Sequence, residues 1–374
     1  MGSSCVWDGW GISFWSNIYI VPGWVGDSQF TYFQVVIGYL IGYLIVANIL
    51  LPLYYKLGLT SIYEYLLSRF GKNSHYVGSI SFLISRILGA SFRLFLVAIV
   101  LQEFVFNDLG IPFEITVIIS ILLIWLYTRR GGIKTIVWTD TIQTTLMILA
   151  VILSIYYIND NLGWTFSDFL SSAEFNEYSK IFVTDSFMDR SYFLKSIIGG
   201  AFITICMTGL DQDMMQKNLT CKNINEAKKN MIVFSFILTA VTFLFIVLGA
   251  LLFIYANQNG VSIPLLDNSP RTDLLFPEIA LRSGLGEFLG IVFILGLIAA
   301  AYSSADSALT SLTTSFCIDI LKIDSSKESS KKTRKIIHVL MSIILILVVI
   351  IYRYVLDKNV ICLLYTSPSP RDSS

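Results

Sequence analysis

A run of hydroxyl side chains and one carboxylate interrupts the apolar segment 286–321, which is long enough to cross a bilayer. From Ala299 to Ser315 the sequence reads AAAYSSADSALTSLTTS, which sets Asp306 among serines and threonines. An intramembrane carboxylate is costly unless a cation or water meets it, so this run predicts a site for a small hard cation such as Na⁺. The alternative is that the hydroxyls bond the carbonyl four residues back, or a neighbouring helix. Helical i, i+3, i+4 spacing puts five positions on one stripe: Ala300, Ser303, Ser304, Ser307 and Ser311.

Three further charged residues fall inside apolar segments. Asp140, in the sequence VWTDTIQ, is either solvated at the membrane interface or paired with Lys134. Arg86 and Arg93 lie seven residues apart and therefore share one face of a helix. Each arginine either extends toward water or pairs with an internal carboxylate, or it binds an anionic substrate through the bidentate bonds that guanidinium makes with carboxylate.

The composition predicts an integral membrane protein. Of the 374 residues, 55% are hydrophobic and only 14% are charged, and the mean hydropathy is +0.70. The net charge of zero gives no reason to expect nucleic acid. Five cysteines without CxxC spacing and two histidines at predicted loop edges, His75 and His338, argue against a zinc site or an enzyme within the bilayer.

Nine apolar segments are candidate spans, and basic residues alternate between the loops that join them. The loops after the second, fourth, sixth and eighth spans hold sixteen Lys and Arg, whereas the loops 107–111, 159–190 and 256–285 hold four. Basic loops face the cytoplasm, so the former are predicted to lie inside. The two long outer loops are expected to form short surface helices. The spans are 11–26 (broken at Pro22-Gly23), 31–55, 76–106, 112–128, 134–158, 191–216, 229–255, 286–321 and 333–353.

One membrane domain is predicted over residues 1–361. The remaining residues, 362–374, read CLLYTSPSPRDSS and suit neither a helix nor a cytoplasmic tail. They are expected to be a translated adapter artefact, the alternative being a disordered Ser/Pro-rich tail. We therefore expect a chain truncated at both ends.

Four stretches resemble the sodium/solute symporter family, which includes the sodium–glucose cotransporters. The resemblance implies an all-α LeuT-like bundle of two inverted five-helix repeats, in which the nine spans are the first nine core helices and the final core helix is missing. The matching stretches are YYKLGLTSIYEYLLSRFG (54–71), RRGGIKTIVWTDTIQ (129–143), TGLDQDMMQKNL (208–219) and AAAYSSADSALTSLTTSFCIDIL (299–321).

The resemblance also implies where the coupling ion binds. Ala300 would offer its backbone carbonyl and Ser303 and Ser304 their hydroxyls to Na⁺, with carbonyls of the broken first helix completing the site. In some family members an acid matching Asp140 joins the eighth helix around a second Na⁺. Two carboxylates on one site need a cation or a proton between them, so either is expected there. The residues of this second site would be Asp140, Ser303, Asp306 and Ser307.

The solute side is predicted on two helices. Sugar-carrying relatives place an aromatic pair just before the equivalent of Gly209–Gln212, but this chain has Met207 and Thr208 there. The missing stacking surface weakens a sugar assignment. Thr204, Met207, Thr208 and Arg93 are the predicted solute-binding residues, with ordinary helix packing as the alternative for the first three.

Together these patterns predict a multi-pass transporter of a bacterial inner (plasma) membrane that couples Na⁺ entry to import of a small polar solute by alternating access. Its partners would be the solute and the lipid bilayer, with no nucleic acid and no obligate protein partner. A sugar, a monocarboxylate, sialic acid, an amino acid and a vitamin all stay open as solutes. The alternatives are a transporter-like membrane sensor, or an inactive fragment of a symporter.

Overall fold

The computed structural model describes residues 20–57, 63–107, 109–219, 221, 223–266, 269–322 and 328–356. Some helical residues are described by their backbone only, among them 127–140 and 299–307. The predicted tail at 362–374 and most of the first predicted span lie outside the described residues.

Helices make up nearly all of the described chain. The N-terminal half holds α3 (Ile20–Ser28), η2 (Gln29–Thr31), α4 (Tyr32–Ile45), η3 (Val46–Leu50), α5 (Leu51–Leu57), α6 (Glu64–Phe70), α7 (Lys72–Leu101), η4 (Gln102–Phe106) and α8 (Phe113–Leu162). The C-terminal half holds α9 (Phe166–Ser171), α10 (Ala173–Tyr178), α11 (Phe193–Thr204), η5 (Ile205–Gly209), α12 (Gln212–Leu219), α13 (Ile224–Asn259), η6 (Thr272–Leu274), α14 (Leu275–Arg282), α15 (Glu287–Ser315), η7 (Phe316–Ile320) and α16 (Glu328–Leu356). A two-residue hairpin pairs β1 (Leu265–Leu266) with β2 (Ser269–Pro270) in antiparallel register.

The described helices include five runs long and apolar enough to cross a membrane: Val21–Leu57, Lys72–Leu101, Thr144–Leu162, Ile224–Asn259 and Lys332–Val355. Shorter apolar helices cover Phe113–Leu126, Phe193–Gly209, Glu287–Ile298 and Ala308–Ile320. Each predicted span from the second to the ninth coincides with these runs. The all-α membrane architecture is therefore confirmed.

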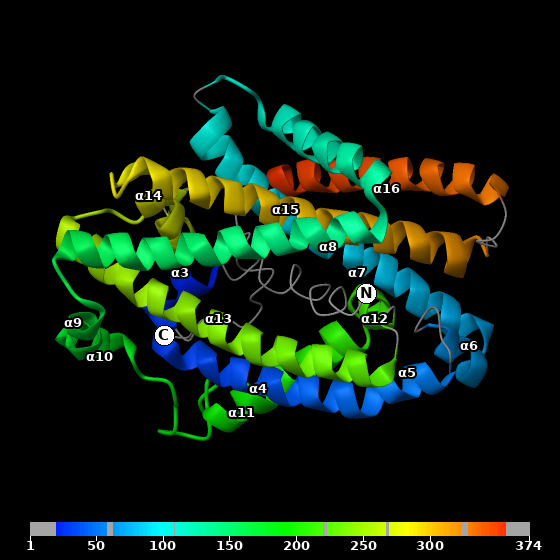
Figure 1. Cartoon of the computed structure of the whole chain (residues 1–374), viewed down its shortest axis with the longest axis horizontal. Helices are drawn as coiled ribbons and strands as arrows, with labels where there is room; N and C mark the ends of the chain where they lie inside the picture. Colours follow the sequence, from blue (N-terminus) through cyan, green and yellow to red (C-terminus); the bar gives the residue numbers. More distant parts are fainter. Residues whose placement is uncertain are drawn as a thin grey trace.

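Two local predictions were wrong. Within the described residues, α3 is helical through Pro22-Gly23. The chain turns instead at Gln29, whose φ of 54° is left-handed. The fourth and fifth spans are separate apolar runs as predicted, but the loop expected between them is helical, so both belong to α8. Drawn out straight, its 50 residues would be about 75 Å long, far more than the roughly 30 Å of a bilayer core. Its ribbon accordingly turns sharply between the two halves (Figure 1).

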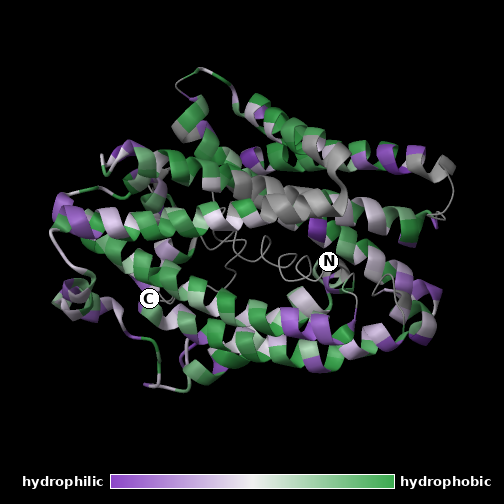
Figure 2. Ribbon diagram, in the orientation of Figure 1, coloured by the Kyte–Doolittle hydropathy of each residue, from purple (hydrophilic) through white to green (hydrophobic). Residues whose placement is uncertain are grey.

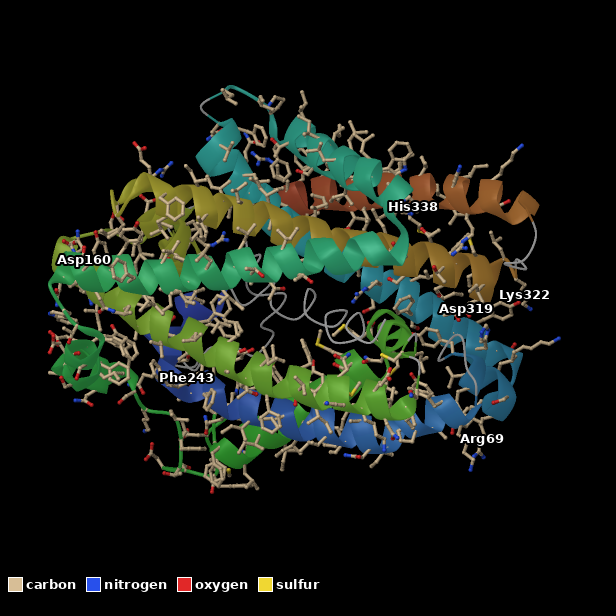
Figure 3. All side chains as sticks on the ribbon, in the orientation of Figure 1. Arg69, Asp160, Phe243, Asp319, Lys322 and His338 are labelled. Carbon is tan, nitrogen blue, oxygen red and sulfur yellow. The ribbon has the colours of Figure 1, made fainter. Side chains whose placement is uncertain are left out.

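The loops separate to two ends of the molecule as the basic residues predicted. The short surface helices α9, α10 and α14 lie at one end, and α6 and the start of α16 lie at the other (Figure 1). Figure 3 likewise sets Asp160 at the first end and Arg69 and Lys322 at the second. We refer to the second as the basic end.

The outer surface of the bundle is apolar. Hydrophobic residues run along the helices between two more polar ends (Figure 2). Large apolar side chains such as Ile84, Leu122 and Leu347 are about half exposed on α7, α8 and α16. Such a surface is unfavourable in water and suits lipid. Helix α13 is the buried centre, and it packs against α3, α4 and α8.

Helices α4 and α11 approach to backbone contact along three glycines, which we call the glycine seam: Gly38 and Gly42 on α4, and Gly200 on α11. A Cβ at Gly38 would lie 2.2 Å from the carbonyl oxygen of Ile197, and one at Gly42 would lie 2.7 Å from that of Ala201. Small residues four apart are the usual means by which membrane helices pack this closely.

Candidate functional site

The predicted solute residues of the sixth span lie where its helix leaves regular geometry. Helix α11 ends at Thr204 and passes into η5, a π-helical turn, and such turns are frequent at functional sites. Thr204 and Thr208 are buried, and the Thr208 hydroxyl donates to the Tyr43 hydroxyl on α4 at 3.4 Å. Met207 is 63% exposed, so it does not share their buried side of the turn. The three roles stay predictions.

A second hydrogen bond, from the helix that continues α4 beyond η3, holds the end of η5. The buried Tyr54 hydroxyl, on α5, donates to the carbonyl oxygen of Gly209 at 2.9 Å. A Cβ on Gly209 would lie 2.5 Å from Leu50 and 3.1 Å from Val46, both in the π-helical turn η3. The second and sixth spans thus meet through two π-helical turns at one level. The sequence contained no signal for either turn.

An ion pair connects the middle of α7 to the point where the sixth span breaks. The Nη1 atom of Arg86 lies 3.6 Å from Oδ2 of Asp211, and the side chains are 9% and 19% exposed. Oδ1 of Asp211 accepts a hydrogen bond from the backbone N–H of Met214 at 3.2 Å, within the first turn of α12. Of the alternatives for Arg86, pairing with an internal carboxylate is therefore confirmed. The side chain of Arg93 lies outside the described ones.

The predicted ion-binding stripe is described through its backbone only. Helix α15 carries it and packs most extensively against α8, which carries Asp140. The two helices run in opposite directions where they touch (Figure 1). The side chains of all the predicted ligands lie outside the described ones: Asp140, Ala300, Ser303, Ser304, Asp306 and Ser307.

A close contact between α15 and α8 shows that Asp140 and the predicted ion-binding residues lie at a similar depth along the two helices. A Cβ on Gly296 would lie 3.6 Å from the backbone of Leu146 and Met147. Ser303 is seven residues after Gly296, and Asp140 is six to seven residues before the contacted pair. Because both helices rise by about 1.5 Å per residue, Ser303 and Asp140 fall at nearly the same level. Positions 300, 303 and 304 also share the helical face of Gly296.

Two polar contacts hold the basic end of α15, and sequence reasoning missed both. His75 Nε2, on α7, lies 3.5 Å from Oδ1 of Asp319 in η7, and the Ser315 hydroxyl donates to Oδ2 at 2.7 Å. Both the His75 and the Asp319 side chains are almost fully buried. His338, on α16, lies with Nδ1 3.1 Å from the Thr313 hydroxyl (Figure 3). His75 lies in the first turn of α7, at the predicted loop edge, whereas His338 lies well within α16; both helices pack on α15.

Three comparisons with known proteins bear on this arrangement. The family model described as "Sodium:solute symporter family" matches residues 12–367. The sodium/sialic acid symporter NanT of Aliivibrio fischeri is 30% identical over 83% of this chain and 60% of its own length. Human sodium-coupled monocarboxylate transporter 1 is 28% identical over 57% of this chain and 33% of its own. This chain thus spans about 60% of the length of its curated sialic acid symporter relatives.

A solved structure extends the comparison to the fold. The substrate-bound outward-open state of a Na⁺-coupled sialic acid symporter superimposes with a TM-score of 0.79 at 26% sequence identity. It covers 97% of this chain, which in turn covers 75% of that chain. The LeuT-like bundle expected from the sequence motifs is confirmed by this likeness.

Proposed function

Because the chain belongs to the sodium:solute symporter family, we propose that it imports a small carboxylate-bearing solute together with Na⁺ by alternating access. The observation that carries the proposal is the family match over residues 12–367, supported by the likeness of the whole bundle to a Na⁺-coupled symporter. Such carriers rock one group of helices against another around a site at mid-membrane. Sodium is the coupling ion, and the solute is a small molecule.

The Na⁺ site is proposed on α15. Positions 300, 303 and 304 follow Gly296 on the face of α15 that approaches α8, which supports an ion site between these two helices. A second cation, or a proton, is proposed between Asp140 and Asp306, with Ser303 and Ser307 as further ligands. The shared level of Asp140 and Ser303 supports this second site.

The solute site is proposed between α7 and the sixth span. Arg93 would bind the carboxylate, and Met207, whose side chain is exposed, would line the other side. Thr204 and Thr208, which pack against α4, would hold that turn in place. A carboxylate is favoured because sialic acid and monocarboxylates, the solutes in the names of the two relatives, share that group. The missing aromatic pair before Gly209 disfavours a sugar that is held by stacking.

The membrane is proposed to be a bacterial inner membrane. Inward Na⁺ movement there gains about 2.3 kcal/mol per charge for each 100 mV of membrane potential. The runs that can span, with basic loops at one end, support a multi-pass protein with that end in the cytoplasm.

The test is uptake into proteoliposomes that contain the full chain, with labelled sialic acid, a short monocarboxylate and glucose, each with and without a Na⁺ gradient. Sodium-dependent uptake of an acid is expected. Ser304→Ala should raise the Na⁺ concentration needed for half-maximal uptake by about tenfold, since one lost ligand contact is worth about 1–3 kcal/mol. The matched control is Thr145→Ala, because that hydroxyl is exposed on α8 and bonds its own helix. Uptake of glucose alone, or of none of the three, would contradict the proposal.

A further inference from the structure

The Arg86–Asp211 ion pair joins two groups of helices, which are also in contact through α13 and through α12 on α15. Helix α11 packs chiefly against α4, where the glycine seam holds them together. Helix α7 packs chiefly against α15 and α16. We call these the α4–α11 group and the α7–α15 group. Arg86 belongs to the α7–α15 group. Asp211 belongs to the α4–α11 group and lies between η5 and α12.

The ion pair also lies between the predicted solute-binding residues and the basic end of the molecule. The sixth span runs from the outer end toward the basic end, so Asp211 lies beyond Thr204 and Thr208 in that direction. Helix α7 runs the opposite way, and Arg93 is about 10 Å further from the basic end than Arg86. Arg93 and Thr204 therefore lie at a similar level, with the ion pair between that level and the cytoplasmic ends of the helices.

From this position we infer that Arg86 and Asp211 close the cytoplasmic side of the solute site, and that the pair separates when that side opens. The inference rests on the proposed transport function. Alternating access requires that the cytoplasmic side be closed while the outer side is open, which is the role this ion pair would fill. Both residues act by positioning the two helix groups, with no contact to the solute required.

Asp211 has two roles that one substitution separates. One carboxylate oxygen caps the first turn of α12, while the other faces Arg86. Asparagine is as good a helix cap as aspartate but carries no charge. Asp211→Asn therefore removes the ion pair and keeps the cap, so its effect reports the attraction between the helix groups.

The experiment measures a distance across the basic end by pulsed electron spin resonance. Spin labels are attached to cysteines placed at Leu57, at the end of α5, and at Ile336, on α16, because both side chains are exposed. The exposed Cys206 is first replaced by serine. Asp211→Asn should shift the population toward the longer, open distance by about tenfold, a usual size for coupling between two states. The charge-swapped chain, Arg86→Asp with Asp211→Arg, should restore the closed distance.

The matched control is Asp319→Asn. It also removes the charge of a buried carboxylate near the basic end, but its partner His75 lies within the same α7–α15 group. It should leave the distance unchanged. If Asp211→Asn leaves the distance unchanged, or if both variants shift it equally, the inference is wrong. Should Asp211→Asn fail to fold, Arg86→Gln makes the same test from α7, and Arg86→Lys, which keeps the charge, should stay closed. The distance needs no transported solute, so its result is independent of the uptake assay.

Discussion

Adding one methyl group to the glycine seam should destabilise the bundle, and the neighbouring residue provides a matched control. A Cβ on Gly200 would lie 2.2 Å from the carbonyl oxygen of Val35, whereas one on Gly199 meets nothing within 4 Å. Ordinary contact needs about 3.4 Å, so α4 and α11 must move apart by about 1 Å in Gly200→Ala. Overpacking of this kind costs about 1–3 kcal/mol.

The control cancels the effect of helix propensity. Replacing glycine by alanine within a helix gains about 1 kcal/mol at either position, because the unfolded chain loses freedom. Gly199→Ala should therefore be neutral or slightly stabilising, and the two variants should differ by the steric cost alone. Because a Cβ on Gly42 would already lie 2.6 Å from the Cβ of Thr204, separating the helices also displaces a predicted solute residue.

The assay is the apparent melting temperature of each purified variant in one detergent at one heating rate. Gly200→Ala should melt several degrees below Gly199→Ala and should transport more slowly. If the two variants melt together, the backbone contact between α4 and α11 is wrong, and with it the division into two helix groups.

Two further outcomes are expected elsewhere in the chain. Tyr54→Phe removes the donor to the buried carbonyl of Gly209 at the end of η5, which should cost about 1–3 kcal/mol of stability. The variant should fold and melt at a lower temperature. An unchanged melting temperature would contradict that hydrogen bond. In the outer loop, hydrogen bonds from the Thr165 hydroxyl and backbone lower the pKa of Asp168 below its ordinary value. The capped turn of α9 should therefore be stable above about pH 4 and lose stability as pH falls through that lowered pKa, and Thr165→Ala should raise the pKa in a carboxyl NMR titration.

The sequence predicted the spans well because hydropathy and basic loops are local signals. It failed at α8, where the motif RRGG suggested a loop but the backbone stays helical through it. It also failed at Pro22, where the described backbone is helical on both sides of the proline. Both errors concern how a helix ends, which depends on neighbouring elements.

Partners far apart in the chain were the harder part of the site. Arg86 was expected to pair with some internal carboxylate, but which one depended on how α7 packs beside the sixth span. His75 lies near the start of α7 as predicted, but its contact could not be predicted because its partner, Asp319, is on a helix that comes much later in the sequence. The glycines of the seam were visible as small residues four apart, but only packing shows which helix they meet.

The position of Arg86 also bears on how the chain is made. Helix α7 is synthesised and inserted well before Asp211 exists, and at 5–20 residues per second the interval is roughly ten seconds. During that time a guanidinium near the middle of a nascent membrane helix costs about 2.5–3.5 kcal/mol, which the apolar remainder of α7 must outweigh. Newly inserted α7 therefore depends on the translocon or on early neighbours to shelter its charge. A cell that degrades unassembled membrane helices would recognise chains stalled before the sixth span by that exposed arginine.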